Sequence, residues 1–237
     1  MDAAPAFPLR RQLAALAGVD LLWRRLPVRR VFLKQVYFTG VQALPLLLVA
    51  AVAVAGILVG QLREFGQPPR AALDILLAIT VDELAPLLTA LLVAARSAPA
   101  LASELATMQA RGEVLLLQRL GIAPLQYLLV PRVAAMLLSA LLLVVYFAFV
   151  VAFAGSFFAA GGHFLDALLV AAESLGADRV LAGMGKGMLF GALVALVACH
   201  TGLAARGSWS EVPIAASRAV VRSIALLLLA DLLLVVS

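Results

Sequence analysis

The sequence predicts an all-α membrane protein, with an N-terminal interfacial amphipathic helix followed by five transmembrane helices. Hydrophobic residues make up 65% of the 237-residue chain and charged residues 13%. The mean hydropathy is +1.10, well above that of soluble domains. Apolar runs long enough to cross about 30 Å of hydrocarbon recur along the chain. Because a helix satisfies its own backbone hydrogen bonds in lipid, these runs are predicted to be helices.

Residues 1–34 are predicted to form an interfacial segment on the cytoplasmic side. Apolar residues recur there at steps of three and four between seven cations, which is typical of an amphipathic helix in the headgroup layer. Most of the net charge of +5 lies near predicted span ends, so membrane topology explains it better than nucleic-acid binding does. The periodic residues are Leu9, Leu13, Leu16, Val19 and Trp23.

Residues 35–237 are predicted to form one transmembrane domain of five spans. Pro45 is expected to bend the first span, and the second is expected to continue as a polar helix towards Met108. The third lies in a run without Asp, Glu, Lys or Arg that is too long for one untilted span, so it should tilt or end near Gly155. The expected spans are residues 37–62, 73–95, a part of 133–165, 180–203 and 214–236.

Two shorter helices are expected between the spans. Residues 111–120, inside a structured loop at about 97–124, are predicted to form a separate helix ended by Gly121. Residues 164–177 carry two acids on an apolar background and are predicted to form an interfacial helix on the far side of the membrane.

Small residues at four-residue spacing predict close helix contacts. One pair lies in the first span and one stripe in the fourth. The glycines are Gly56, Gly60, Gly183, Gly187 and Gly191.

The distribution of cations predicts the orientation. With a cytoplasmic N-terminus, the inner segments hold the seven N-terminal cations and seven further arginines, whereas the outer segments hold only Arg63, Arg70 and Arg179. Positive charge is retained preferentially on the cytoplasmic side. Five spans then place the loop at 97–124 in the cytoplasm and the C-terminus on the opposite side.

Four charged residues are predicted to lie inside spans, where an unpaired charge costs several kcal/mol. They are Asp82, Glu83, Lys186 and Asp231. Two interpretations stay open for Glu83 and Lys186: a functional polar site, or a structural ion pair that fixes helix register. Asp82 and Glu83 are adjacent and therefore point to different faces of a helix.

The sequence favours no enzymatic activity and no cofactor. It contains no glycine-rich loop for nucleotide phosphates and no hydrolase or zinc-protease motif. His163 and His200 lie on different segments, and Cys199 is the single cysteine, so no metal site is expected. If the protein moves a molecule against a gradient, the energy comes from a partner or an ion gradient.

Several stretches resemble the MlaE (YrbE) permeases of ABC-type phospholipid transporters. They are QVYFTGVQALP at 35–45, ELAPLLTALLVAARSAPALASELATM at 83–108, LGIAPLQYLLVPR at 120–132, KGMLFG at 186–191 and SRAVVRSIALLLLAD at 217–231. The resemblance covers about residues 30–235 in collinear order. By position, Glu83, Lys186 and Asp231 match polar residues of that family's transmembrane domain.

The resemblance implies a homodimeric subunit in the bacterial inner membrane. It would work with two cytoplasmic ATPase subunits, a periplasmic ring of MCE-domain proteins and often a STAS-domain protein, and it would move phospholipid between the inner membrane and the outer envelope. The alternatives are a proton-coupled secondary transporter using Asp82, Glu83 and Asp231, a non-transporting membrane scaffold and, last, an intramembrane enzyme.

The resemblance also implies a coupling helix to the ATPase at 108–124, although residues 111–115 depart from the family's usual Thr-Glu-Gln and Ile-Asp. Glu113 would offer a carboxylate to a basic groove, and Val114 and Leu117 would supply apolar contact. The alternative is a helix that lies on the membrane surface. The candidate coupling residues are Met108, Arg111, Glu113, Val114, Leu117 and Gly121.

Overall fold

The structure is a computed structural model that describes residues 26–160, 163–205 and 207–236. Every regular element in these ranges is helical, and five helical stretches are long and apolar enough to cross a membrane. The predicted all-α fold with five spans is therefore confirmed. The elements are α2 (Leu26–Thr39), the 3-10 turn η1 (Val41–Ala43), α3 (Leu44–Glu64), α4 (Pro69–Ile79), the π turn η2 (Thr80–Leu84), α5 (Ala85–Ala110), α6 (Glu113–Arg119), α7 (Pro124–Ala159), α8 (Phe164–Ser174), α9 (Ala177–Leu203) and α10 (Glu211–Val236).

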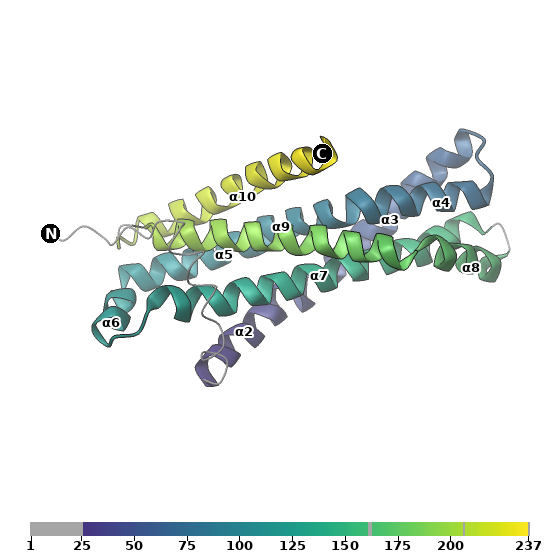
Figure 1. The fold of residues 1–237 in the computed structure, drawn as a ribbon. Helices are drawn as coiled ribbons and strands as arrows, with labels where there is room; N and C mark the ends of the chain where they lie inside the picture. Colours follow the sequence, from purple (N-terminus) through teal and green to yellow (C-terminus); the bar gives the residue numbers. More distant parts are fainter. Residues whose placement is uncertain (1–25, 161–162, 206, 237) are drawn as a thin grey trace.

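The long helices form an elongated bundle. Figure 1 shows α5, α7 and α9 running along its length, with α6 at one end and α4 and α8 at the other. Helix α7 lies in the middle of the packing and contacts α3, α5 and α9, whereas α10 packs on α5 and α9 at the edge. In the most apolar window of each helix, 50% of the residues are buried in α7 but only 17% in α10.

The first span is interrupted before Pro45 and not bent at it. Helix α2 ends at Thr39, and α3 starts at Leu44 with Pro45 in its first turn, where the missing N–H is no loss. The break coincides with Gly40, at which a Cβ would lie 2.8 Å from the Val36 carbonyl oxygen. The expected segment boundary after residue 34 falls inside α2, and the amphipathic pattern of residues 9–23 lies outside the described residues.

The second span continues as predicted but contains an unexpected turn. Helices α4 and α5 form one continuous stretch from Pro69 to Ala110. Between them, residues 80–84 have π geometry, in which the turn holds one residue more than an α turn. The sequence analysis anticipated the length of this stretch and not the turn.

The third span begins earlier than predicted and ends within the predicted run. Helix α7 begins at Pro124, passes through Pro131 and ends at Ala159. At 1.5 Å per residue its 36 residues span about 54 Å, which exceeds a hydrocarbon thickness of about 30 Å. Gly155 is not a terminus, because α7 continues to Ala159. A Cβ at Gly155 would overlap the side chain of Leu76, so this glycine marks a close contact with α4.

The shorter helices lie near their predicted positions. Helix α8 begins at Phe164, and α6 is followed by Gly121, whose φ of 71° is left-handed. Two candidate coupling residues that were expected inside the coupling helix lie before α6: Met108 belongs to α5, and Arg111 follows the end of α5. The left-handed Gly112, with φ 74°, separates α5 from α6 and causes this difference.

Helix α10 is packed along its first two-thirds and little beyond them. Its buried residues recur every four positions and end at Leu227, beyond which no described residue of α10 is buried. In Figure 1 the C-terminal end of α10 diverges from the bundle. The buried residues are Ala215, Ala219, Ser223 and Leu227.

Candidate functional site

Three of the four predicted intramembrane charges meet in one cluster. The Nζ atom of Lys186 on α9 donates a hydrogen bond to Oε2 of Glu83 at 2.5 Å and lies 2.9 Å from Oδ1 of Asp231 on α10. The ammonium also lies 5.9 Å from the centre of the Phe190 ring. We call Glu83, Lys186 and Asp231 the three-helix cluster. Asp82, one residue before Glu83, makes no ion pair within the described ranges.

The π turn and a glycine contact position this cluster. Glu83 lies inside the π turn, and α9 approaches that turn at Gly183, where a Cβ would lie 2.9 Å from the Val81 carbonyl oxygen. Gly183 and Lys186 are three residues apart and therefore lie on neighbouring parts of one helix face. The glycine thus lets α9 come close enough for its lysine to contact Glu83.

The cluster carries one cation and two carboxylates, so its net charge is −1 when all three groups are ionised. The side chains of Lys186 and Asp231 are 13% and 16% exposed, whereas that of Glu83 is 47% exposed. Ion pairs with little water around them are strong only while both partners stay in place. The arrangement can therefore exchange ion pairs with a charged group that approaches from the open side of Glu83.

The later glycines of the α9 stripe pack against α7. A Cβ at Gly187 would lie 2.6 Å from Cγ2 of Val144, and one at Gly191 would lie 2.7 Å from Cβ of Ala140. The pair on α3 differs, because a Cβ at Gly56 would lie 3.2 Å from the Phe158 ring, whereas Gly60 has no neighbour within 4 Å.

A second charged pair was not identified from the sequence. The side chain of Arg132 on α7 is 3% exposed; its Nη2 lies 3.1 Å from Oε1 of Glu104 on α5, and its Nη1 donates to the Leu128 carbonyl oxygen at 2.9 Å. Glu104 is 47% exposed. We call Arg132 and Glu104 the two-helix pair. One signal in the sequence could have indicated this pair: Glu104 lies between Leu101 and Leu105, whose spacing is that of a buried helix face.

The predicted coupling residues gather at the end of the bundle that holds α6. Val114 is buried, Leu117 packs against the core, and Glu113 lies 3.6 Å from Arg111 in an exposed ion pair. Met108 contacts the core from α5. The Gln109 amide donates to the Leu203 carbonyl oxygen at 2.9 Å, which ties α5 to the last turn of α9. Leu115, Leu116 and Leu120 are exposed.

The described ranges contain no group of three His, Cys, Asp or Glu side chains that could hold a metal ion. Cys199 is buried. The ammonium and the two carboxylates of the three-helix cluster form ion pairs and a hydrogen bond.

Comparison with known proteins gives one family model, described as Permease MlaE, which matches residues 32–237. A probable ABC transporter permease protein of Synechocystis is 31% identical over 206 residues, 83% of this chain and 77% of that protein. One of Rickettsia felis is 27% identical over 230 residues, 93% of this chain and 88% of that protein. The chloroplastic protein TRIGALACTOSYLDIACYLGLYCEROL 1 of Arabidopsis thaliana is 33% identical over 156 residues, and the match spans 44% of its length.

Proposed function

Because the chain belongs to the MlaE permease family of ABC transporters, we propose that it forms the membrane path of a transporter for phospholipid or a similar lipid. The observation that carries this proposal is the three-helix cluster at the edge of α10. It offers charge to a headgroup, and the exposed apolar C-terminal third of α10 lies beside it. One relative bears the name of a galactolipid, which agrees with a lipid cargo.

Membership in an ABC transporter family implies a cytoplasmic ATPase partner. We propose that α6 is the element that docks on this ATPase. It is short, and left-handed glycines on both sides separate it from α5 and α7, the two long helices to which it is joined. Its buried Val114 fixes it to the bundle while Glu113 stays exposed for a basic partner.

The membrane path is proposed to form between two copies of the chain in the bacterial inner membrane. The N-terminus and α6 would lie in the cytoplasm, and α8 and the C-terminus would lie on the periplasmic side, next to an MCE-domain protein. A STAS-domain protein would accompany the ATPase. Lys186 is nine residues from the start of α9, about 14 Å along the helix, so the cluster would lie in the periplasmic half of the membrane. The cavity would be walled by the first, second and fifth spans and open to the periplasm.

Purification of the full chain from native membranes tests the whole proposal. We expect an ATPase, an MCE-domain protein and phospholipid to be recovered with it. Single cysteines on the exposed C-terminal third of α10, such as Leu232→Cys, should cross-link two copies in a Cys199→Ala background, whereas Leu169→Cys on α8 should not. Recovery of the chain as a monomer without an ATPase would contradict the proposal.

The coupling role of α6 has its own test in the reconstituted complex. Glu113→Lys and Leu117→Asp are each expected to abolish lipid-stimulated ATP hydrolysis while the protein still folds, because interfaces of this size depend on a few anchors. Arg70→Glu at the opposite end of the bundle is the control. Unchanged hydrolysis in both α6 variants would remove α6 from the mechanism.

Reporter fusions test the orientation. A reporter inserted at Gly112 should be active in the cytoplasm, and one fused after Ser237 should be active outside it. A cytoplasmic C-terminus would contradict the proposed topology.

A further inference from the structure

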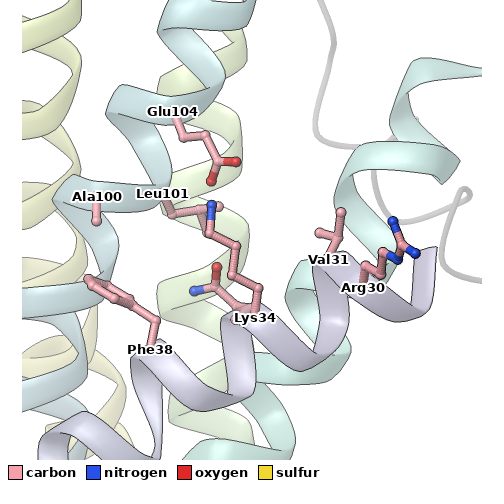
Figure 2. A pocket seen from close by; sticks show the side chains of 8 residues that line it. Arg30, Val31, Lys34, Phe38, Ala100, Leu101 and Glu104 are labelled. Atoms are coloured by element: carbon pink, nitrogen blue, oxygen red, sulfur yellow. The ribbon is translucent and has the colours of Figure 1, made fainter. Parts of the chain in front are cut away.

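A cavity lies between α2 and α5, near the end of the bundle that holds α6. It has a volume of about 410 Å³, which is within the range of small-molecule sites. Figure 2 shows its charged side chains on both walls, with Arg30 and Lys34 on α2 and Glu104 on α5. The apolar part of the lining includes Val31, Phe38 and Leu101.

Two cations on α2 face this cavity without a described counter-charge. Arg30 and Lys34 are four residues apart, so they lie one above the other on a single helix face. Within the described ranges, neither is joined to a carboxylate by an ion pair. An Arg–Lys pair of this spacing suits the oxygens of a phosphate, which arginine can bind with two parallel hydrogen bonds.

Glu104 places a negative charge on the opposite wall. One of its oxygens, Oε1, is engaged with Arg132 at 3.1 Å, and the side chain remains 47% exposed. In Figure 2 the Lys34 side chain extends towards the Glu104 carboxylate. The free part of this carboxylate favours a positive group of the ligand over a second negative one, so a ligand carrying a phosphate and an ammonium would find an opposite charge for each.

The apolar residues complete the description of the ligand. Val31 and Phe38 belong to the same helix as the two cations, and Leu101 is three residues before Glu104. Charged groups therefore lie beside apolar surface on both walls. Basic pockets between membrane helices on the cytoplasmic side are a known setting for lipid headgroups.

We propose that this cavity binds the headgroup of an aminophospholipid. The phosphate lies between Arg30 and Lys34, the ammonium lies at Glu104, and the acyl chains leave along Val31 and Phe38. This site is separate from the three-helix cluster, because Glu104 follows Glu83 by 21 residues, about 30 Å along the second span. A bound lipid joins α2 to α5, the helix that leads to α6.

The test measures lipid binding to the purified full chain by native mass spectrometry. Phosphatidylethanolamine, its N-methylated forms and phosphatidylglycerol are compared with identical acyl chains. The wild-type chain is expected to bind phosphatidylethanolamine most tightly, with affinity falling as each methyl group removes an N–H donor. The double variant Arg30→Gln/Lys34→Gln should lose at least tenfold in affinity for all of these lipids, and the control Arg70→Gln should lose nothing.

Glu104→Gln separates the two charges of the headgroup. The substituted amide keeps an oxygen for Arg132, so the chain is expected to fold, to bind phosphatidylethanolamine more weakly and to bind phosphatidylglycerol at least as well. Tighter binding of phosphatidylglycerol than of phosphatidylethanolamine by the wild-type chain would overturn the ammonium assignment. Unchanged binding in the double variant would overturn the site itself.

Two competitors distinguish a lipid headgroup from free phosphate. Glycerophosphoethanolamine, which has no acyl chains, should displace the bound lipid more effectively than inorganic phosphate does. Equal displacement by inorganic phosphate would show a simple anion site and would overturn the proposal. These outcomes do not depend on whether the protein transports lipid.

Discussion

The cations Lys186 and Arg132 are both largely covered by protein, and the structure holds them in different ways. Arg132 pairs with one carboxylate and with a carbonyl oxygen of its own helix, and it joins α7 to α5 near the end of the bundle that holds α6. Lys186 pairs with two carboxylates, one from the π turn and one from the C-terminal third of α10, where no described residue is fully buried.

Arg132 adds an ion pair to helices that apolar packing already holds together. Lys186 instead holds α10 where apolar packing is sparse. Around Arg132, the helices are also held together by buried apolar residues such as Leu101, Leu105 and Met136. Beyond Leu227, no described residue of α10 is fully buried and Ala230 is the residue that still packs on the core, so the ion pair with Asp231 is a main tie of that end to α9. The two-helix pair is therefore expected to govern stability, and the three-helix cluster is expected to govern movement of α10.

The largest expected effect is on stability, from Glu104→Ala. Removing this carboxylate leaves the guanidinium of Arg132 buried without a counter-charge, which should lower the free energy of unfolding by about 3–5 kcal/mol. Unfolding in detergent measures it. The control is Glu113→Ala, whose exposed ion pair with Arg111 should contribute about 1 kcal/mol or less. If Glu104→Ala lowers the free energy of unfolding no more than Glu113→Ala does, the two-helix pair does not govern stability.

The second prediction changes packing beside the cluster without changing charge. Gly187→Ala introduces a Cβ 2.6 Å from Val144 and should lower the free energy of unfolding by about 1–3 kcal/mol. Gly60→Ala meets no atom within 4 Å, so it should be neutral or raise stability by up to about 1 kcal/mol. Equal effects of the two substitutions would show that α9 is not closely packed at Gly187.

The third prediction concerns transport. Lys186→Met leaves Glu83 and Asp231 without their shared cation, so the tie to α10 is lost. Lipid transport by the reconstituted complex should fall about tenfold, equivalent to about 1.4 kcal/mol. Its loss of stability should be smaller than that of Glu104→Ala, because Glu83 is half exposed. Full transport by this variant would mean that the cluster only fixes helix register.

The smallest expected effect sharpens the roles of the two acids. Glu83→Gln removes the more exposed carboxylate and leaves the ion pair with Asp231, so transport should fall by about threefold, equivalent to about 0.7 kcal/mol. Asp231→Asn, which releases α10, should have the larger effect on the transport rate measured in vesicles. If Glu83→Gln reduces the transport rate more than Asp231→Asn does, the ion pair that matters for transport is the one with the second span and not the one with α10.

Hydropathy predicted the number of spans well, because apolar length is a property of the sequence alone. It did not predict where helices start and stop. Helix α7 begins at Pro124 because a proline fits the first turn of a helix, and the first span breaks at Gly40, one turn before the proline that was expected to bend it. The π turn at 80–84 has no signal in hydropathy, since its hydrogen bonds depend on the packing of α9 against Val81.

The members of the three-helix cluster were identifiable because charge is rare inside a span. Their pairing was not, since Glu83, Lys186 and Asp231 lie on three helices whose relative register is set by contacts such as that at Gly183. Arg132 was counted only as one of the seven further arginines of the inner segments. Only the tertiary structure shows that it is buried and that Glu104 is its partner.

The π turn gives the second span a spare residue. Five residues, Thr80 to Leu84, occupy a turn that an α-helix would build with fewer. Releasing that residue into α geometry turns α4 relative to α5 by about 100° and shifts it by about 1.5 Å, one step of a helical screw. Such a step carries Glu83 off the face that meets Lys186. The ion pair between Glu83 and Lys186 and the winding of the second span are thus expected to be coupled, because a change in the winding would break the ion pair.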